Sequence, residues 1–272
     1  MNQDQLQSSY SWDTGLLRDV NEDSILCTKF ELLTHVGIIS AGLFAVADGM
    51  GGHNAGEIAS NLAVRAFLTE CTLRLFAQQP DSPRAILSAA LEKANKQVLE
   101  SASDRELKGM GTTFTASLVM GGDMYIAHVG DSRCYIINSR EIIQVTKDHS
   151  LVQQLIDTGT ITPEEARCHP RRNEITRALG YSDTINPDLY QVKLYADDII
   201  LLCSDGLHNT LSSEKINETV LSASNIDAAC TDLTALANLA EGPDNISVIM
   251  AKPQNLPSWQ AVITAKTGIR RI

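Results

Sequence analysis

The sequence of 272 residues contains no paired cysteines, no long apolar run and no excess of basic residues. Its six cysteines are scattered without a C-x-x-C pair, which excludes the usual zinc-binding spacings and a dense disulfide framework. No apolar stretch approaches the roughly 20 residues that a membrane-spanning helix needs. The first five residues are polar and acidic, unlike a signal peptide. We therefore expect a cytoplasmic protein that does not contact a membrane.

Basic residues are scarce relative to acidic ones. The chain has 22 Lys and Arg against 33 Asp and Glu, which gives a formal net charge of −11. Nucleic acids and anionic membranes require basic patches, so this charge argues against both as partners. Two alternatives remain compatible with the acidity: carboxylates that bind cations, or a surface charge that maintains solubility. Charge alone does not separate them.

Apolar periodicity divides the chain into strands and helices of one large α+β domain. Alternating or β-branched runs predict strands over residues 8–12, 25–28, 44–47, 112–120, 124–129, 134–138, 141–145, 190–194, 198–203 and 246–250. Helical periods and N-cap signals predict helices over residues 57–78, 82–101, 150–158, 213–223 and 227–241, with a short one from 162. The tight links between residues 112 and 145 favour an antiparallel meander over parallel crossovers. Residues 253–272 lose all periodicity, and we expect a loosely attached tail.

The most informative stretch runs from residue 44 to residue 57. An apolar run ends at Asp48, glycines follow at positions 49, 51 and 52, and a helical pattern begins after Gly56. This order is typical of a buried strand that presents a carboxylate at its end and then turns sharply beside a ligand. Taken alone, the stretch fits an ordinary strand–turn–helix connection with a solvated Asp equally well.

Three further carboxylates, Glu22, Asp205 and Asp244, also lie at strand borders. The charged run around Glu22 could equally form a solvated loop. Burial of all four carboxylates would require compensation, and no Lys or Arg adjoins Asp48, Asp205 or Asp244 in the sequence. Hard divalent cations, Mg²⁺ or Mn²⁺ rather than zinc, are the simplest compensation. Two such ions can activate water and clamp a phosphoryl group, and Arg18 could contact the phosphate through two N–H groups.

Together these segments resemble the motifs of the protein phosphatase 2C family of metal-dependent protein phosphatases, and most of all its bacterial, kinase-partnered branch. The resemblance covers about residues 8–251. It rests on six motifs in the family's order and spacing: Arg18-x-x-Asn21-Glu22-Asp23, Val46-Ala47-Asp48-Gly49-Met50-Gly51-Gly52, Gly111-Thr112-Thr113, Val129-Gly130-Asp131-Ser132-Arg133, Ser204-Asp205-Gly206-Leu207 and Asp244-Asn245-Ile246-Ser247.

The resemblance implies an α+β fold, a four-layer αββα sandwich in which two stacked antiparallel sheets are flanked by helix pairs. It implies hydrolysis of phosphoserine and phosphothreonine in proteins with two Mn²⁺ or Mg²⁺ ions, by a metal-bridging hydroxide that attacks phosphorus in line. It also implies a catalytic domain over residues 1–252, a flap at about residues 150–175 beside the active site, and a tail over residues 253–272. We expect phosphoprotein substrates, a cognate Ser/Thr kinase and a monomer.

The motif positions imply the metal ligands. Asp48 would bridge both ions. Asp205 and Asp244 would complete the ligands of one ion, while Glu22 and the carbonyl of Gly49 would hold the other.

The same positions imply the groups around the metals. Arg18 would bind the substrate phosphate, and Asp23 and Asn245 would support the ligands from behind. The basic segment 167–173 falls within the implied flap, which favours arginines that meet an anionic substrate over a solvated loop.

The chain departs from the family pattern at two places. The family often has Asp where this chain has Asn209, and that Asp together with the one matching Asp131 holds a third, weaker metal ion. A third ion at Asp131 is therefore an open expectation. Animal members place a His directly after the Asp-Gly, as a general acid; here Met50 occupies that place and His53 follows. His53 is a candidate catalytic acid, with a structural role as the alternative and a metal-bound water as another proton donor.

Two other functions remain compatible with the sequence. A phosphoprotein-binding regulator with weakened catalysis is favoured by Asn209 alone. A metal-dependent hydrolase of small phosphoesters would use the same carboxylates.

Overall fold

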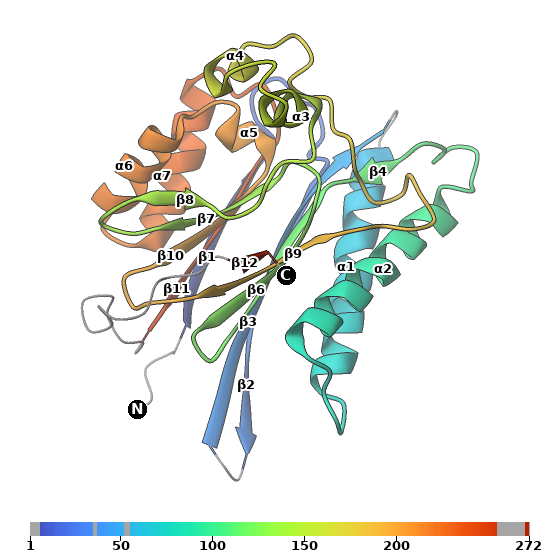
Figure 1. Cartoon of the computed structure of the whole chain (residues 1–272), viewed down its shortest axis with the longest axis vertical. Helices are drawn as coiled ribbons and strands as arrows, with labels where there is room; N and C mark the ends of the chain where they lie inside the picture. The colour runs from blue at the N-terminus through green and yellow to red at the C-terminus, as the bar shows by residue number, and fades with distance from the viewer. Residues whose placement is uncertain (1–5, 35–36, 52–54, 255–269, 272) are drawn as a thin grey trace.

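Two antiparallel sheets stack face to face, and a pair of helices covers each outer face (Figure 1). The computed structural model describes residues 6–34, 37–51, 55–254 and 270–271. The strands are β1 (Leu6–Asp13), β2 (Asp23–Thr34), β3 (Gly37–Met50), β4 (Gly111–Thr112), β5 (Phe114–Met120), β6 (Asp123–Val129), β7 (Arg133–Ile137), β8 (Ile142–Gln144), β9 (Asp188–Lys193), β10 (Ile199–Cys203), β11 (Ile246–Pro253) and β12 (Arg270–Arg271). The helices are α1 (Ala55–Leu75), α2 (Pro83–Ser101), α3 (Leu151–Asp157), α4 (Pro163–Arg167), α5 (Asp205–His208), α6 (Ser213–Ser222) and α7 (Ile226–Leu239). The predicted α+β sandwich is confirmed.

The strand order brings the two ends of the domain together. One sheet has the order β1-β11-β10-β7-β8, and the other has the order β12-β9-β6-β5-β3-β2, with β4 paired to β3 outside that path. Strand β1 pairs antiparallel with β11, so that Asp13 lies opposite Ile246. The loop that follows β1 therefore lies beside the loop that precedes β11. This pairing juxtaposes Arg18 and Asp244, which are 226 positions apart in the sequence.

Strand β3 is buried on both faces, which explains why its sequence is apolar without alternation. Leu43, Ala45 and Ala47 pack in the core shared with α1 and α2. Phe44 and Val46 point the other way, into the core between the two sheets. Because both faces of this central strand are covered, each successive side chain is buried.

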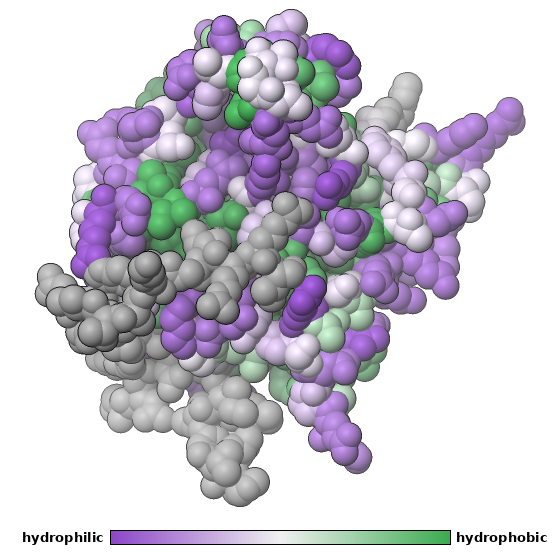
Figure 2. Space-filling model, viewed as in Figure 1, coloured by the Kyte–Doolittle hydropathy of each residue, from purple (hydrophilic) through white to green (hydrophobic). Residues whose placement is uncertain are grey.

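A third core packs α5, α6 and α7 against the five-stranded sheet, with side chains such as Leu207, Ile216 and Leu233. Most apolar side chains of the described residues therefore pack between the layers. Figure 2 agrees with this distribution, because the face in view is largely hydrophilic and shows hydrophobic side chains only in separate patches.

Residues 150–175 form an excursion at the upper end of the sandwich that carries α3 and α4 (Figure 1). An isolated bridge between Ser150 and Ile175 closes its base. The predicted capping box is present at the start of α4, where the side chain of Thr162 accepts from the backbone N–H of Glu165 and the Glu165 carboxylate accepts from that of Thr162. These contacts delimit the segment that the sequence identified as a flap.

The structure differs from the predicted elements mainly in length. Strands β2 and β3 form one long hairpin, in register from Asp23 opposite Asp48 to Thr34 opposite Gly37, where only residues 25–28 and 44–47 were predicted. Charged residues such as Lys29 and Glu31 interrupt the apolar pattern along this hairpin. Helix α5 was not predicted, because its four residues are too short for helical periodicity.

Two residues of the expected tail belong to a sheet. Arg270 lies opposite Gln191 and Arg271 opposite Tyr190, so that β12 extends the edge at β9. At these two positions the expectation of a loosely attached tail is wrong. Residues 255–269 lie outside the described part of the chain, and the domain boundary at 252 stays a prediction.

The aromatic packing under α1 gives a stability prediction. Phe67 is fully buried and its ring centroid lies 4.9 Å from that of Phe114. We expect Phe67→Ala to lower the free energy of unfolding by about 3–5 kcal/mol, because it leaves a cavity in a close-packed core. Leu221→Ala, at a side chain that is 44% exposed, is the control and should change it by less than about 1 kcal/mol. Urea denaturation measures both, and equal losses would contradict this account of the core.

Candidate active site

Four carboxylates from separate segments gather where the ends of the two sheets meet. Asp48 is near the end of β3, Glu22 precedes β2, Asp205 begins α5 after β10, and Asp244 precedes β11. Close backbone contacts join these segments: the N–H of Gly49 donates to the carbonyl of Glu22 over 3.2 Å. A side chain at Gly49 or at Gly206 would collide with backbone oxygens, because the added Cβ would lie 2.1 Å from one of them in each case. Glycine is therefore required for these segments to approach one another.

The carboxylates are close enough to perturb one another. Burial raises the pKa of Asp48 well above its usual value, and the charges of Asp23, Asp205, Asp131 and Asp244 raise it further. Burial and then Asp244 raise the pKa of Asp205 to about 6. The crowding of like charges therefore favours the protonated form of both carboxyl groups.

Arg18 supplies a cation at the mouth of the cluster. Its Nη2 donates to Oδ2 of Asp244 over 2.9 Å, and 45% of its side chain is exposed. Burial raises the pKa of Glu22, while the nearby charge of Arg18 lowers it. The guanidinium therefore faces solvent on one side and the carboxylates on the other.

Asp23 lies directly opposite Asp48 in the β2–β3 pair and supports the cluster from inside. Its Oδ2 accepts hydrogen bonds from the hydroxyls of Ser204 (2.7 Å) and Ser247 (2.6 Å). Its Oδ1 is buried without a partner in the described part of the chain. Burial raises the pKa of Asp23 to about 7, against the opposing effect of the two serine hydroxyls. Both serines belong to motifs quoted from the sequence, but no role was assigned to them there, because nothing in the sequence links them to Asp23.

Asn245 connects three segments of the site through its side chain. Its Oδ1 accepts from the N–H of Glu22 over 2.8 Å. Its Nδ2 donates to the carbonyls of Thr14 and Val20 over 2.9 and 3.0 Å. Asn245 therefore holds both ends of the Arg18 loop together with the backbone of Glu22.

Asp131 borders a second, wider part of the site. It lies in the link between β6 and β7, and burial together with Asp205 raises its pKa well above its usual value. A cavity of about 580 Å³ separates it from the flap and is also lined by Asn209, Arg167 and Arg172. Asn209 donates through Nδ2 to Oδ2 of Asp205 over 3.0 Å. Two arginines of the predicted basic segment therefore face the same cavity as Asp131.

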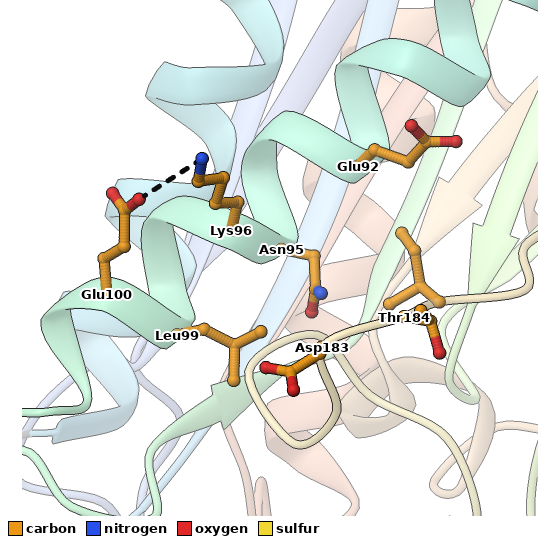
Figure 3. A pocket seen from close by; sticks show the side chains of 8 residues that line it. Glu92, Asn95, Lys96, Leu99, Glu100, Asp183 and Thr184 are labelled. Carbon is orange, nitrogen blue, oxygen red and sulfur yellow. Dashed lines mark ion pairs between the residues drawn. The ribbon is translucent and has the colours of Figure 1, made fainter.

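Another cavity lies apart from the carboxylates, between α2 and the loop that precedes β9 (Figure 3). It holds about 620 Å³, and its lining includes Leu99, Asp183 and the ion pair of Lys96 with Glu100. The buried Asn95 at its floor is satisfied by the backbone, since it accepts from Gly180 and donates to Ser182. These contacts fix the loop on α2.

The donor set of the cluster suits hard divalent cations, because every candidate ligand is an oxygen and the negative charges crowd one another. In the described part of the chain, no three His, Cys, Asp or Glu side chains are already grouped as ligands of a single ion. In the structure Asp244 instead accepts from Arg18, and Asp205 accepts from Asn209. Divalent cations would offset the remaining negative charge of the cluster. His53, the candidate acid, lies outside the described residues.

Comparison with known proteins identifies the class. The family model of protein phosphatase 2C matches residues 31–239. The chain is 36% identical over 251 residues to the serine/threonine phosphatase stp of Listeria monocytogenes, covering 91% of this chain and 96% of that protein. The chain therefore belongs to the protein phosphatase 2C family, the class of serine/threonine protein phosphatases that its motifs predicted.

Two further relatives agree with this assignment. The serine/threonine protein phosphatase PstP of Mycobacterium tuberculosis is 40% identical over 241 residues, which are 88% of this chain but only 43% of that protein. A crystal structure of the PstP catalytic domain in complex with two manganese ions superposes with a TM-score of 0.78 at 36% identity, covering 92% of this chain and 99% of that one. In the described residues, no helix is both long and apolar enough to cross a membrane.

The raised pKa of Asp23 gives a testable pH dependence in the absence of metal. Because its pKa rises from 3.8 to about 7 on folding, the folded protein holds a proton that the unfolded chain releases between these pH values. The carboxyl therefore lowers the free energy of unfolding as the pH increases through this window. Relative to Asp23→Asn, the wild type should lose about 2 kcal/mol between pH 5 and pH 7.5 in EDTA.

Urea denaturation at both pH values measures this difference. Comparison with Asp23→Asn cancels the opposite effect of the buried neutral histidines, because both proteins contain them. If the free energies of unfolding of the two proteins changed with pH in the same way, the raised pKa of Asp23 would be contradicted.

Proposed function

We propose that the chain hydrolyses phosphoserine and phosphothreonine in proteins, with two Mn²⁺ or Mg²⁺ ions held by the carboxylate cluster. The convergence of Glu22, Asp48, Asp205 and Asp244, with Arg18 at their mouth, is the observation that supports this function. The names of the relatives and the two manganese ions in the PstP structure support it independently.

We assign the ligands by their segments. By its motif, Asp48 is the candidate bridge between two ions. Asp205 and Asp244 are the candidate further ligands of one ion, and Glu22 and the carbonyl of Gly49, whose segments are joined by a backbone hydrogen bond, are those of the other. Bound divalent cations supply Lewis acidity, which activates water and offsets charge on a phosphoryl group. The backbone of Asp48 is held on both sides, since Thr113 accepts from its N–H through Oγ1 and donates to its carbonyl.

Arg18 is the candidate group for substrate phosphate. One of its nitrogens donates to Asp244, and its exposed side leaves further N–H groups for phosphate oxygens. Because Asp244 orients the guanidinium, loss of either residue should disturb phosphate binding. The proton donor to the leaving serine or threonine oxygen stays a prediction, with His53 as one candidate and water as the other.

Asp131 is the candidate ligand of a weaker third cation, in the cavity under the flap. The amide of Asn209 provides less negative charge there than an Asp would. The arginines of the flap that line this cavity are placed to meet an anionic substrate.

The proposed activity also implies a cellular partner and a compartment. A phosphatase for phosphoserine and phosphothreonine opposes a Ser/Thr kinase, and the bacterial relatives named serine/threonine phosphatases support this role. All six cysteines are free, which suits a reducing cytoplasm. We also propose that the chain acts as a monomer.

Two alternatives make different predictions in one assay. Release of phosphate from a phosphothreonine peptide, measured with Mn²⁺ and with EDTA, should require the metal. A phosphoprotein-binding regulator would bind the peptide without turnover. A small-ester hydrolase would turn over only an aryl phosphate.

Removal of a central carboxylate tests the catalytic assignment. We expect Asp48→Ala and Asp205→Ala each to reduce Mn²⁺-dependent turnover of a phosphothreonine peptide by more than about a hundredfold, because each removes charge that holds cations. The fold should persist, since neither side chain packs in an apolar core. Asp232→Ala, at an exposed carboxylate on α7, is the matched control and should retain full activity. Retention of most activity in either cluster variant, with a normal unfolding transition, would overturn the assignment.

Asn209→Asp tests the third cation. In the structure the amide of Asn209 donates to Asp205, and a second carboxylate there would repel Asp205 unless a cation lies between them. We expect the variant to reach half-maximal activity at a lower Mn²⁺ concentration than the wild type. A titration curve identical to that of the wild type would dismiss a third cation that matters for turnover.

A further inference from the structure

The loop that carries Arg18 also exposes large apolar side chains. Leu16 is 65% exposed, Leu17 is 71% exposed and Val20 is 36% exposed. Leu239, at the end of α7, is 82% exposed. We call these four side chains the apolar lip, and they leave apolar surface in water beside a polar catalytic cluster.

Leu17 and Val20 flank Arg18 in the sequence, and Leu16 contacts the segment that leads to Asp244. The N–H of Leu16 donates to the carbonyl of Gly242 over 2.9 Å, and the side chain of Leu16 lies against the space above Gly242. Gly242 follows Leu239 by three residues and precedes Asp244, the partner of Arg18, by two. The Arg18 loop and the segment after α7 therefore form one surface around the Arg18–Asp244 ion pair.

The fold holds the leucines outward. Asn245 fixes both ends of the loop through the carbonyls of Thr14 and Val20. Gly15 accepts no side chain, since its φ is +78° and an added Cβ would lie 2.2 Å from the carbonyl oxygen of Asp244. The N–H of Gly15 is bound by the carboxylate of Asp13 over 2.8 Å. With its backbone tied at these points, the loop cannot turn Leu16 and Leu17 inward without breaking several hydrogen bonds.

Some exposed apolar side chains elsewhere on the molecule lie away from the carboxylate segments. Leu221, for example, projects from α6, and a scattered exposed leucine is normal on a protein surface. Leu16 and Leu17 are consecutive and directly precede the residue assigned to the substrate phosphate. An apolar patch at the rim of a functional site is typical of a recognition surface.

We propose that the apolar lip binds an aliphatic or aromatic side chain within about three residues of the phosphorylated Ser or Thr in the protein substrate. This inference rests on the proposed function, because that function places the phosphate at Arg18. A substrate bound there has its flanking residues within about 10 Å of the phosphorylated residue, since an extended chain advances about 3.5 Å per residue. Flanking residues on one side of the phosphorylated residue are then within reach of the side chains beside Arg18. The lip thus selects substrates by the sequence around the phosphorylation site.

A pair of matched peptides tests the lip. The two phosphothreonine peptides have the same length and net charge, and one carries leucines where the other carries glutamines, at positions one to three from the phosphothreonine. We expect the wild type to favour the leucine peptide by about tenfold in kcat/KM, mainly through KM, because burial of one leucine is worth about that factor. Leu16→Gln and Leu17→Gln should reduce this preference toward one.

The control variant is Leu73→Gln, because Leu73 on α1 is 66% exposed and resembles the lip leucines in exposure. It should retain the wild-type preference. Equal turnover of both peptides by the wild type would overturn the lip while leaving the proposed function intact. Absence of Mn²⁺-dependent turnover of either peptide would instead overturn the proposed function.

Two further outcomes would also contradict the lip. If Leu16→Gln and Leu17→Gln reduced turnover of an aryl phosphate as much as that of both peptides, the leucines would serve the loop and not recognition. If sedimentation showed a wild-type dimer that these variants abolish, the occupant of the surface would be a second copy of the chain.

Discussion

The crowding of like charges at the junction of the two sheets is the constraint on which the rest of the structure depends. Asp48 and Asp205 have their pKa values raised by burial and by neighbouring carboxylates, and Asp23 lies directly opposite Asp48 in the sheet. Such a cluster is unfavourable unless positive charge enters it. Arg18, paired with Asp244, provides part of that charge in the structure. Divalent cations would provide more of it, and the same electrostatic need that draws them in makes the site chemically useful.

The fold tolerates this crowding because the supporting contacts are made by the most firmly packed elements. Strand β3, buried on both faces, delivers Asp48, and Thr113 holds the backbone of Asp48. Asn245 ties β11 to the loops on either side of Arg18 and Glu22. Asp48, Glu22 and Asp205 are thus each anchored through a backbone hydrogen bond, which leaves their carboxyl groups to meet a cation. Hydrolysis of a phosphoester requires ligands that the protein holds in fixed positions and whose negative charge binds cations.

Much of the site could be predicted because its residues adjoin strong local signals. Asp48 follows an apolar run and precedes glycines, and Asp205 repeats the same order, so both were candidates without structural data, and the family motifs then implied their roles. The hydrogen bonds from Ser204 and Ser247 to Asp23 could not, because they span 181 and 224 positions and serine carries no distinctive pattern. The extent of the β2–β3 hairpin was missed because its outer part alternates poorly between apolar and polar residues. The exposure of Leu16 and Leu17 could not be predicted either. An apolar residue in a sequence gives no sign that hydrogen bonds of the surrounding backbone hold its side chain toward solvent.

Anomalous diffraction from crystals grown in manganese tests the central claim most directly. The account predicts two anomalous peaks in the cluster, both in contact with Asp48, with Glu22 beside one and Asp205 and Asp244 beside the other. Absence of peaks among these carboxylates at saturating manganese, or peaks only elsewhere on the molecule, would contradict it.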